Sequence, residues 1–175
     1  MTEARLLTDR SRPAVRLERH LGDPPAVVWR ALTEREQLRS WFPCEVILSG
    51  GRWEVGAEIS FPFPAELMDL TLTGVVLEVD EPHVLAYTWG DDTLRFELSP
   101  DGDGTRLVLI DELPRDSAAR NAAGWEWCLD RLAGLEPAAD GWRRQFERYA
   151  VEFERTLGPQ QARPTASSGE GAGAA

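Results

Sequence analysis

The sequence predicts an α+β fold in which a long amphipathic helix closes the concave side of a curved antiparallel sheet. Three observations predict it. One strand and two short helices open the folded part, a run of closely spaced strands follows, and the C-terminal region is helical with its apolar residues on one side. Consecutive short strands separated by turns pair as an antiparallel meander. A chain of 175 residues has the size of one domain.

The first elements are a strand and two short helices. Residues 14–21 alternate apolar and polar, which is typical of a half-buried strand. A helix over residues 25–32 follows, because the proline pair before it suits a first helical turn. Thr33 and Glu36 have the spacing of a capping box, and they predict a second short helix that ends before Pro43.

Six short strands are predicted in the middle of the chain, where apolar residues alternate with polar ones between turn signals. The clearest alternation places Leu94 and Phe96 on one face and Arg95 on the other. The predicted strands cover residues 45–48, 57–63, 71–79, 83–89, 93–99 and 106–112.

The C-terminal region predicts one long helix with a break. Between residues 124 and 135, four apolar residues follow an i, i+3, i+4, i+7 stripe, and a second stripe begins after Asp140. Gly134 and Pro137 lie between the stripes, so we expect the break there. The first stripe consists of Trp125, Cys128, Leu129 and Leu132.

The composition predicts one folded domain with flexible ends. We expect residues 1–13 to form a flexible leader and residues 14–157 to form the domain. Residues 158–175 consist mainly of Gly, Ala, Ser and Pro, so we expect a disordered tail.

The charge balance excludes several classes of function. The sequence has 30 acidic and 19 basic residues, a formal net charge of −11, and every basic residue is arginine. The acids concentrate between residues 65 and 112, so this surface repels nucleic-acid phosphates and anionic lipid. No apolar run reaches the roughly 20 residues of a membrane span, and the N-terminus lacks the apolar core of a secretory signal. We therefore expect a cytoplasmic protein that binds no nucleic acid.

No metal site and no cofactor are expected. Cys44 and Cys128 are far apart, with no CxxC pair and no nearby histidine pair, and Cys128 is interpreted as a small buried residue. The sequence has no phosphate-binding loop, no HExxH and no GxSxG. His20 and His83 fall near polar strand ends, where we expect both to be exposed.

The aromatic residues are the main positive signal. The sequence contains 7 Trp, and most aromatic residues fall at inward positions. Such side chains either fill a core or line a ligand cavity, and the pattern leaves both interpretations open. The candidate ligand-binding residues are Phe61, Phe63, Tyr87, Trp89, Phe96 and Trp125, with Cys128 and Leu132 from the helical stripe.

Asp111 completes this candidate site. It shares a strand face with Leu107 and Leu109, where a carboxylate is expensive unless it is hydrogen-bonded or partly hydrated. It either orients a ligand, with a raised pKa, or lies in water at the strand end.

Two further acidic segments have a functional and a structural interpretation. The loop with Glu66, Met68 and Asp69 either gates a cavity mouth or is plain surface. Asp91 and Asp92 lack the Glu and Gly of a calcium loop, so we assign them to turn chemistry.

This order of elements resembles the START-like, helix-grip superfamily, also called SRPBCC. Several phrases look like one branch of it, the homologues of activators of the heat-shock chaperone ATPase. The phrases are DPPAVVWRALTEREQLRSWF, GAEISF, GVVLEVDEPHVLAYTWG, GTRLVLIDE and GWEWCLDRLAGL. The likeness covers about residues 14–157. The resemblance implies a sheet and a long helix around an apolar cavity. Bacterial members of this branch often carry a His near the position of Asp111, which this sequence lacks.

The resemblance and the residues together lead to one leading hypothesis and two alternatives. The leading one is a non-catalytic domain that binds a small apolar ligand in an internal cavity. One alternative is an interaction module that modulates a chaperone ATPase or another protein partner through the acidic stretch at residues 78–112. The other is a cyclase or hydrolase that uses Asp111 with Tyr87, although the sequence offers only that one carboxylate for a pair.

Overall fold

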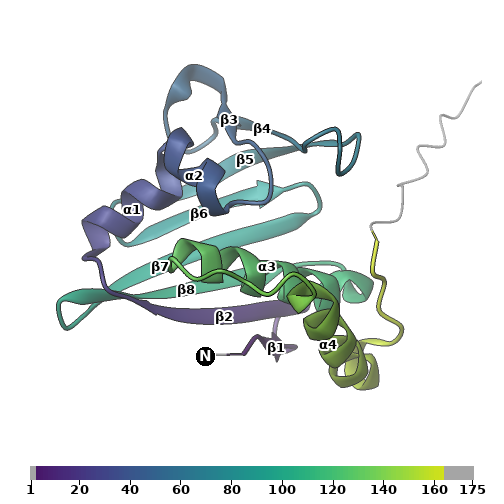
Figure 1. The fold of residues 1–175 in the computed structure, drawn as a ribbon. Helices are drawn as coiled ribbons and strands as arrows, with labels where there is room; N and C mark the ends of the chain where they lie inside the picture. Colours follow the sequence, from purple (N-terminus) through teal and green to yellow (C-terminus); the bar gives the residue numbers. More distant parts are fainter. Residues whose placement is uncertain (1–2, 164–175) are drawn as a thin grey trace, which may run out of the picture.

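The computed structural model describes residues 3–163 and arranges eight antiparallel strands in one curved sheet (Figure 1). The strand order is β1-β2-β8-β7-β6-β5-β4-β3, so β3 to β8 form a meander and β2 pairs with its last strand. The strands are β1 (Arg5–Leu7), β2 (Ala14–Leu21), β3 (Ile47–Leu48), β4 (Glu58–Pro62), β5 (Thr71–Asp80), β6 (Val84–Trp89), β7 (Asp92–Asp101) and β8 (Gly104–Glu112).

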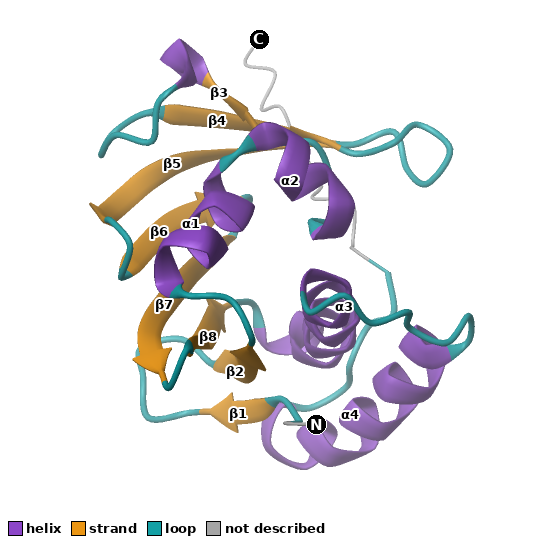
Figure 2. Cartoon of the chain, turned by 60° about the vertical axis from the view of Figure 1, so that its left-hand side comes forward, coloured by secondary structure: helices purple, strands orange, loops and turns teal. Residues whose placement is uncertain are grey.

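Three of the four helices cover the concave face of the sheet. Helices α1 (Pro25–Thr33) and α2 (Arg35–Trp41) lie over one part of it and α3 (Ala118–Leu132) over another, while α4 (Gly141–Leu157) packs on the outer side of α3 (Figure 2). The α+β helix-grip prediction is therefore confirmed. The predicted long helix is two separate helices, and it is α3 rather than the longer α4 that covers the sheet.

A glycine permits the sheet to bend between β5 and β6. A Cβ atom at Gly74 would lie 1.8 Å from the Thr88 carbonyl oxygen, so only glycine allows this approach. The pairing of β5 with β6 then shifts register between Val76 and Glu78. Such an irregularity increases local twist and curvature, which helps to form the concave face.

The N-terminal segment differs from the expected flexible leader. Within it, Arg5–Leu7 form strand β1, which pairs with β2 at the edge of the sheet, and Ala4 is buried. Three residues are too few to show an alternating pattern, so this strand has no signature in the sequence. Of the expected tail, residues 164–175 lie outside the described residues, whereas the Gln160 side chain donates to the Arg115 carbonyl oxygen at 2.9 Å.

The helix boundaries also differ from the prediction. The predicted capping box is wrong: the N-cap of α2 is Glu34, and the Thr33 hydroxyl donates instead to the Trp29 carbonyl oxygen at 2.8 Å, within the last turn of α1. Helix α3 begins at Ala118, six residues before the predicted start, because its first turns pack through small alanines that give no large apolar stripe. Among residues 3–163, no helix is long and apolar enough to cross a bilayer.

Candidate functional site

Most of the predicted aromatic site residues pack against one another on the concave face, between the sheet and the helices α2 and α3. Tyr87 stacks between Phe61 and Phe96, with ring centroids 5.9 and 6.1 Å apart. Phe42, which follows α2, inserts between the sheet and α3 and lies 5.6 Å from Trp125. Trp89 lies 5.4 Å from Trp125, so β6 and α3 are in direct aromatic contact. These rings form a continuous packed layer on the concave face.

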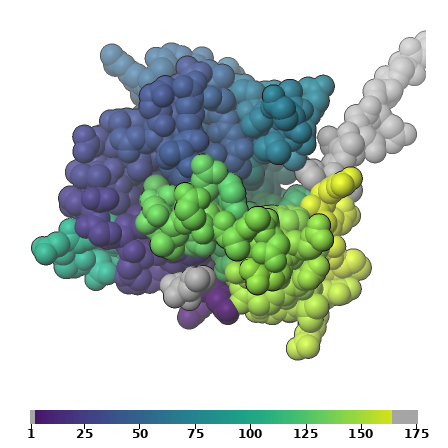
Figure 3. Space-filling model, in the orientation of Figure 1, coloured from purple at the N-terminus to yellow at the C-terminus, as the bar shows by residue number. Residues whose placement is uncertain are grey.

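In the described part of the chain, one hollow lies beside this aromatic layer and another lies away from it. One, of about 280 Å³, opens between the end of β2, helices α1 and α2, and the end of α3, with Trp41 and Leu132 in its wall. The other, of about 600 Å³, is a groove on the convex side over β3, β4 and β5. Of the predicted ligand-binding residues, only Leu132 lines either hollow. Seen from the helix side, α1, α2 and α3 cover the concave face, and α4 lies beside α3 (Figure 3).

A polar cluster interrupts the aromatic layer at one end of the sheet. Asp92 begins β7, Asp111 is the penultimate residue of β8, and Asn121 and Trp125 lie one turn apart on α3. The Asn121 side-chain amide donates to Asp92 Oδ2 at 2.7 Å and to Asp111 Oδ2 at 2.9 Å. The Trp125 indole N–H donates to the same Asp111 oxygen at 2.8 Å. One amide therefore holds two buried carboxyl groups together.

The Asp111 carboxyl group is only half satisfied. Its side chain has no exposed surface, and Oδ1 has no hydrogen-bond partner, whereas Oδ2 accepts two N–H groups. Burial raises the pKa of Asp111 well above its ordinary value, and the nearby Asp92 charge raises it further. Burial also raises the pKa of Asp92, to about 6, against the opposing effect of its hydrogen bond from Asn121.

Two arginines surround this pair of carboxyl groups. Arg12, from the loop between β1 and β2, donates to the Asp91 carbonyl oxygen at 2.8 Å and favours the charged form of Asp92. Arg120, on α3, also favours that form, although burial lowers the pKa of its own guanidinium. The positive charge near Asp92 makes Asp92 the partner that ionises first.

Cys44 lies beside a second unpartnered group. The Trp89 indole N–H is buried without a hydrogen bond of normal geometry, although it lies near enough to the Cys44 sulfur to favour its thiolate form. Burial nevertheless raises the pKa of Cys44 and of Cys128 to about 12, so both thiols stay protonated near neutral pH. Cys128 is buried on α3, as expected of a small core residue.

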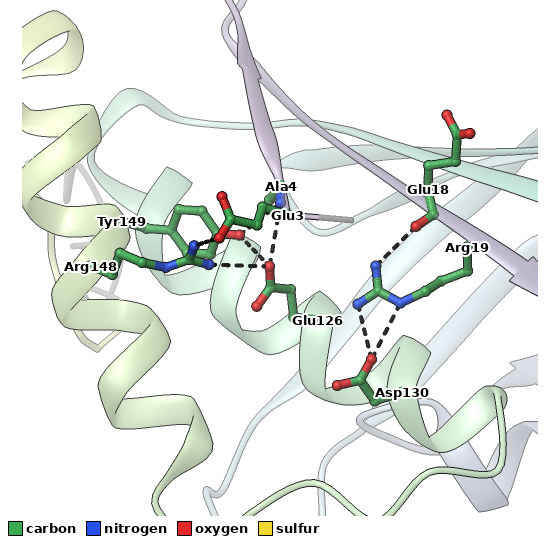
Figure 4. Close-up of polar contacts among 8 residues, drawn as sticks. All are labelled: Glu3, Ala4, Glu18, Arg19, Glu126, Asp130, Arg148 and Tyr149. Atoms are coloured by element: carbon green, nitrogen blue, oxygen red, sulfur yellow. Dashed lines mark hydrogen bonds and ion pairs between the residues drawn. The ribbon is translucent and has the colours of Figure 1, made fainter. Parts of the chain in front are cut away.

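A second buried carboxyl group lies on the outer side of α3, next to α4 (Figure 4). Glu126 Oε1 accepts a short hydrogen bond from the Tyr149 hydroxyl, lies 3.3 Å from the Ala4 backbone N–H and is 3.5 Å from an Arg148 nitrogen. Arg148 also pairs with Glu3. This cluster fastens the segment before β1 to both C-terminal helices.

Sequence reasoning missed Asp92, Asn121 and Glu126. The sequence pattern assigns Asp92 with Asp91 to turn chemistry, yet Asp92 is buried and continues the inward alternation of Leu94, a signal that could have identified it. With Asp92, the site has the second carboxylate that the enzyme alternative lacked. The interpretation of Asp111 as a strand-end residue in water is wrong, because its side chain is fully buried.

The remaining candidates lie on the surface. Glu66 and Asp69 are exposed in the loop between β4 and β5, and Met68 is 36% exposed. The His20 side chain is 58% exposed, with its ring nitrogens 2.6 Å from Asp101 and 3.5 Å from Glu18. His83 is 56% exposed and lies 3.9 Å from Asp80.

The comparison of sequences identifies the family. The sequence model of the family described as Activator of Hsp90 ATPase homolog 1-like protein matches residues 23–136, which is more than half of the chain. The chain belongs to this family. The match includes Asp92, Asp111 and all of α3, and it ends before α4. No curated protein matches the chain.

Solved structures with the same fold come from several bacteria. CalU16 from Micromonospora echinospora is 21% identical at a TM-score of 0.67, and the match covers 88% of this chain and 96% of that one. A conserved protein of unknown function, EF2215 from Enterococcus faecalis, is 24% identical at a TM-score of 0.69, covering 87% and 91%. The protein encoded by BPP1335 from Bordetella parapertussis is 24% identical at 0.62, covering 89% and 92%. At these identities, the likeness extends to the fold alone.

Proposed function

We propose that this protein binds a small, mostly apolar molecule between the sheet and α3, and that the Asp111 cluster receives the polar group of that molecule. One observation carries the proposal. Asp111 Oδ1 is buried without a partner in an otherwise aromatic interior, at the end of the sheet where α3 supplies Asn121 and Trp125. Family membership is consistent with a ligand-binding domain.

A buried polar atom without a hydrogen bond has a cost in free energy. Leaving a buried hydrogen-bonding group unsatisfied costs about 1–3 kcal/mol, and proteins keep few such groups. A ligand that supplies the missing partner recovers this free energy. Burial of its apolar part would contribute about 25 cal/mol for each Å² removed from water.

Binding at this site requires some aromatic side chains to move, because the rings beneath α3 are in contact. The most accessible part of the layer is its edge at the loop that joins β4 to β5. There Phe63 packs on Trp89 with ring centroids 6.1 Å apart, and Leu67 is 71% exposed. We propose that Phe63 and this loop swing outward to admit the ligand, which retains the predicted gating role of Glu66, Met68 and Asp69.

The test is native mass spectrometry of the purified protein before and after denaturing extraction. We expect a small molecule bound to the wild type, released on denaturation, and reduced at least fivefold in Asp111→Leu, as the loss of one buried hydrogen bond implies. Asp9→Leu, at an exposed position away from the β4–β5 loop, is the matched control and should retain the molecule. Equal occupancy in wild type and Asp111→Leu would contradict the proposed site, and an empty wild type that binds no apolar probe would contradict the function.

A second candidate function is association with a protein partner, favoured by the convex groove. Three apolar side chains are exposed there or beside it: Ile47 (42%), Val75 (39%) and Leu77 (47%). Contiguous exposed apolar residues commonly mark interaction sites. A Val75→Glu substitution separates the two candidates, since it should abolish partner association and leave binding beneath α3 unchanged.

A further inference from the structure

We infer that the ligand presents a hydrogen-bond acceptor to Asp111, with a carbonyl oxygen on a flat aromatic frame as the best fit. This inference rests on the proposed function and specifies its ligand class. It follows from the hydrogen bonds that already join Asp92, Asp111, Asn121 and Trp125, and from the one oxygen that makes none.

First, the Asp111 oxygen on the side of α3 already makes two hydrogen bonds. Oδ2 accepts from Asn121 Nδ2 and from Trp125 Nε1, and neither nitrogen can accept a hydrogen bond in return. The other hydrogen of the Asn121 amide is donated to Asp92. A proton on Asp111 therefore has no place at Oδ2, and it must reside on Oδ1.

The second step decides which carboxyl group holds a proton. Two buried carboxyl groups that share one amide do not both ionise readily, because like charges repel strongly where water is excluded. Asp111 has no exposed surface, whereas Asp92 is 9% exposed, and the Arg120 and Arg12 charges favour the charged form of Asp92, with Arg12 acting on Asp111 as well. Asp92 is therefore the carboxylate near neutral pH, and Asp111 is the neutral acid, in agreement with the raised pKa values of both.

The third step concerns the chemistry that Asp111 then offers. A neutral Asp111 has an O–H donor at Oδ1, the atom that lacks a partner in the structure. A carbonyl oxygen satisfies this donor and leaves nothing unpaired. A ligand hydroxyl could accept the bond but would bury its own hydrogen, and a ligand carboxylate would face the Asp92 charge. The indole rings of Trp89 and Trp125, with centroids 5.4 Å apart, favour a flat aromatic frame.

The experiment compares probes of nearly equal size by quenching of tryptophan fluorescence near neutral pH. The probes are acetylnaphthalene, which has a carbonyl acceptor, isopropylnaphthalene, which has none, and naphthoate, which is an anion. We expect the wild type to bind acetylnaphthalene about fivefold to tenfold more tightly than isopropylnaphthalene, the factor that one net hydrogen bond supplies. Naphthoate should bind most weakly.

Two substitutions at one position separate a donor from an acceptor. In Asp111→Asn, the amide oxygen can face Asn121 and Trp125 and the amide N–H₂ can occupy the place of Oδ1, so the preference for acetylnaphthalene should persist. In Asp111→Leu the donor is gone, so that preference should vanish while isopropylnaphthalene still binds. If Asp111→Leu does not fold, as judged by circular dichroism, the wild type and Asp111→Asn still decide the question. Infrared difference spectra should also show a protonated carboxyl band in the wild type that Asp111→Asn lacks.

The outcomes distinguish this inference from the function on which it rests. If none of the probes binds, the proposed function fails for ligands of this class, and the inference fails with it. If the apolar probes bind but the wild type shows no preference for the carbonyl, or naphthoate binds most tightly, the function stands and the inference is overturned. Loss of the preference in Asp111→Asn would likewise show that Asp111 acts as an ionised acceptor.

Discussion

Helix α3 contributes to two buried carboxyl clusters that differ in how fully they are hydrogen-bonded. On its outer side, Glu126 has a hydroxyl, a backbone N–H and an arginine around one oxygen, and these partners come from two separate segments, α4 and the residues before β1. On its sheet side, both donors to Asp111 approach one oxygen and the other oxygen has none. The hydrogen-bonded Glu126 cluster holds chain segments together, whereas the Asp111 cluster keeps one oxygen free for a further hydrogen bond.

The outer cluster is not complete in every atom. Arg148 Nε is buried without a partner, although other nitrogens of the same guanidinium pair with Glu3 and Glu126. A further link, from Arg19 on β2 to Asp130 on α3 at 3.0 Å, ties the sheet to the same helix (Figure 4). Anchoring on this side is thus shared between several polar contacts, and the following predictions compare it with the Asp111 side.

The largest expected effect is the loss of Glu126. Glu126→Leu leaves the Tyr149 hydroxyl, the Ala4 N–H and Arg148 without their shared acceptor, so we expect a loss of about 3 kcal/mol in the free energy of unfolding. Urea denaturation measures it, and hydrogen exchange should become faster in β1. Glu152→Leu, at an exposed position of α4, is the control and should change stability by less than about 0.5 kcal/mol. A loss below about 1 kcal/mol in Glu126→Leu would show that this cluster does not anchor the chain.

The next effect is a pH dependence that belongs to the Asp92 side. Burial raises the Asp92 pKa from 3.8 in the unfolded chain to about 6 in the folded protein. Between these two pH values, Asp92 is protonated in the folded state and ionised in the unfolded state. The associated stability is fully present below about pH 4 and is lost as the pH rises through about 6. Asparagine does not ionise, so the variant Asp92→Asn does not lose this stability. We therefore expect the free energy of unfolding of Asp92→Asn, relative to that of the wild type, to rise by up to about 2–3 kcal/mol between about pH 4 and pH 7.

Urea denaturation across this pH range measures the gain, with Asp69→Asn as the control for the removal of an exposed charge. The prediction fails if the difference between wild type and Asp92→Asn is independent of pH. It also fails if the difference has the opposite sign, with the variant gaining stability as the pH falls.

The smallest effect compares the two indoles that contact each other. The Trp125 N–H donates to Asp111, whereas the Trp89 N–H has no hydrogen bond of normal geometry. Trp125→Phe and Trp89→Phe each replace an indole by a smaller ring, and only Trp125→Phe also removes a hydrogen bond. We expect Trp125→Phe to be less stable than Trp89→Phe by about 1 kcal/mol in urea denaturation. Equal losses would mean that the bond to Asp111 contributes nothing to stability.

The fold was largely predictable from the sequence because long alternating strands and apolar stripes are local patterns. Strand β7 and the C-terminal half of α3 follow such patterns, whereas β1 is too short to show one. The site was predictable only in part. Asp111 was found because its own strand placed it inward, but its link to Asp92 through Asn121 joins three elements and has no signature in any one of them.

The two outermost strands of the sheet are very short, which bears on how copies of this protein meet. In the described part of the chain, β1 has three residues and β3 has two, so each rim offers few unpaired N–H and C=O groups in line. Long exposed rims are the usual starting points for strand-to-strand aggregation, and short ones suppress it. The short β1 and β3 therefore leave neighbouring molecules little backbone with which to pair along the edges of the sheet.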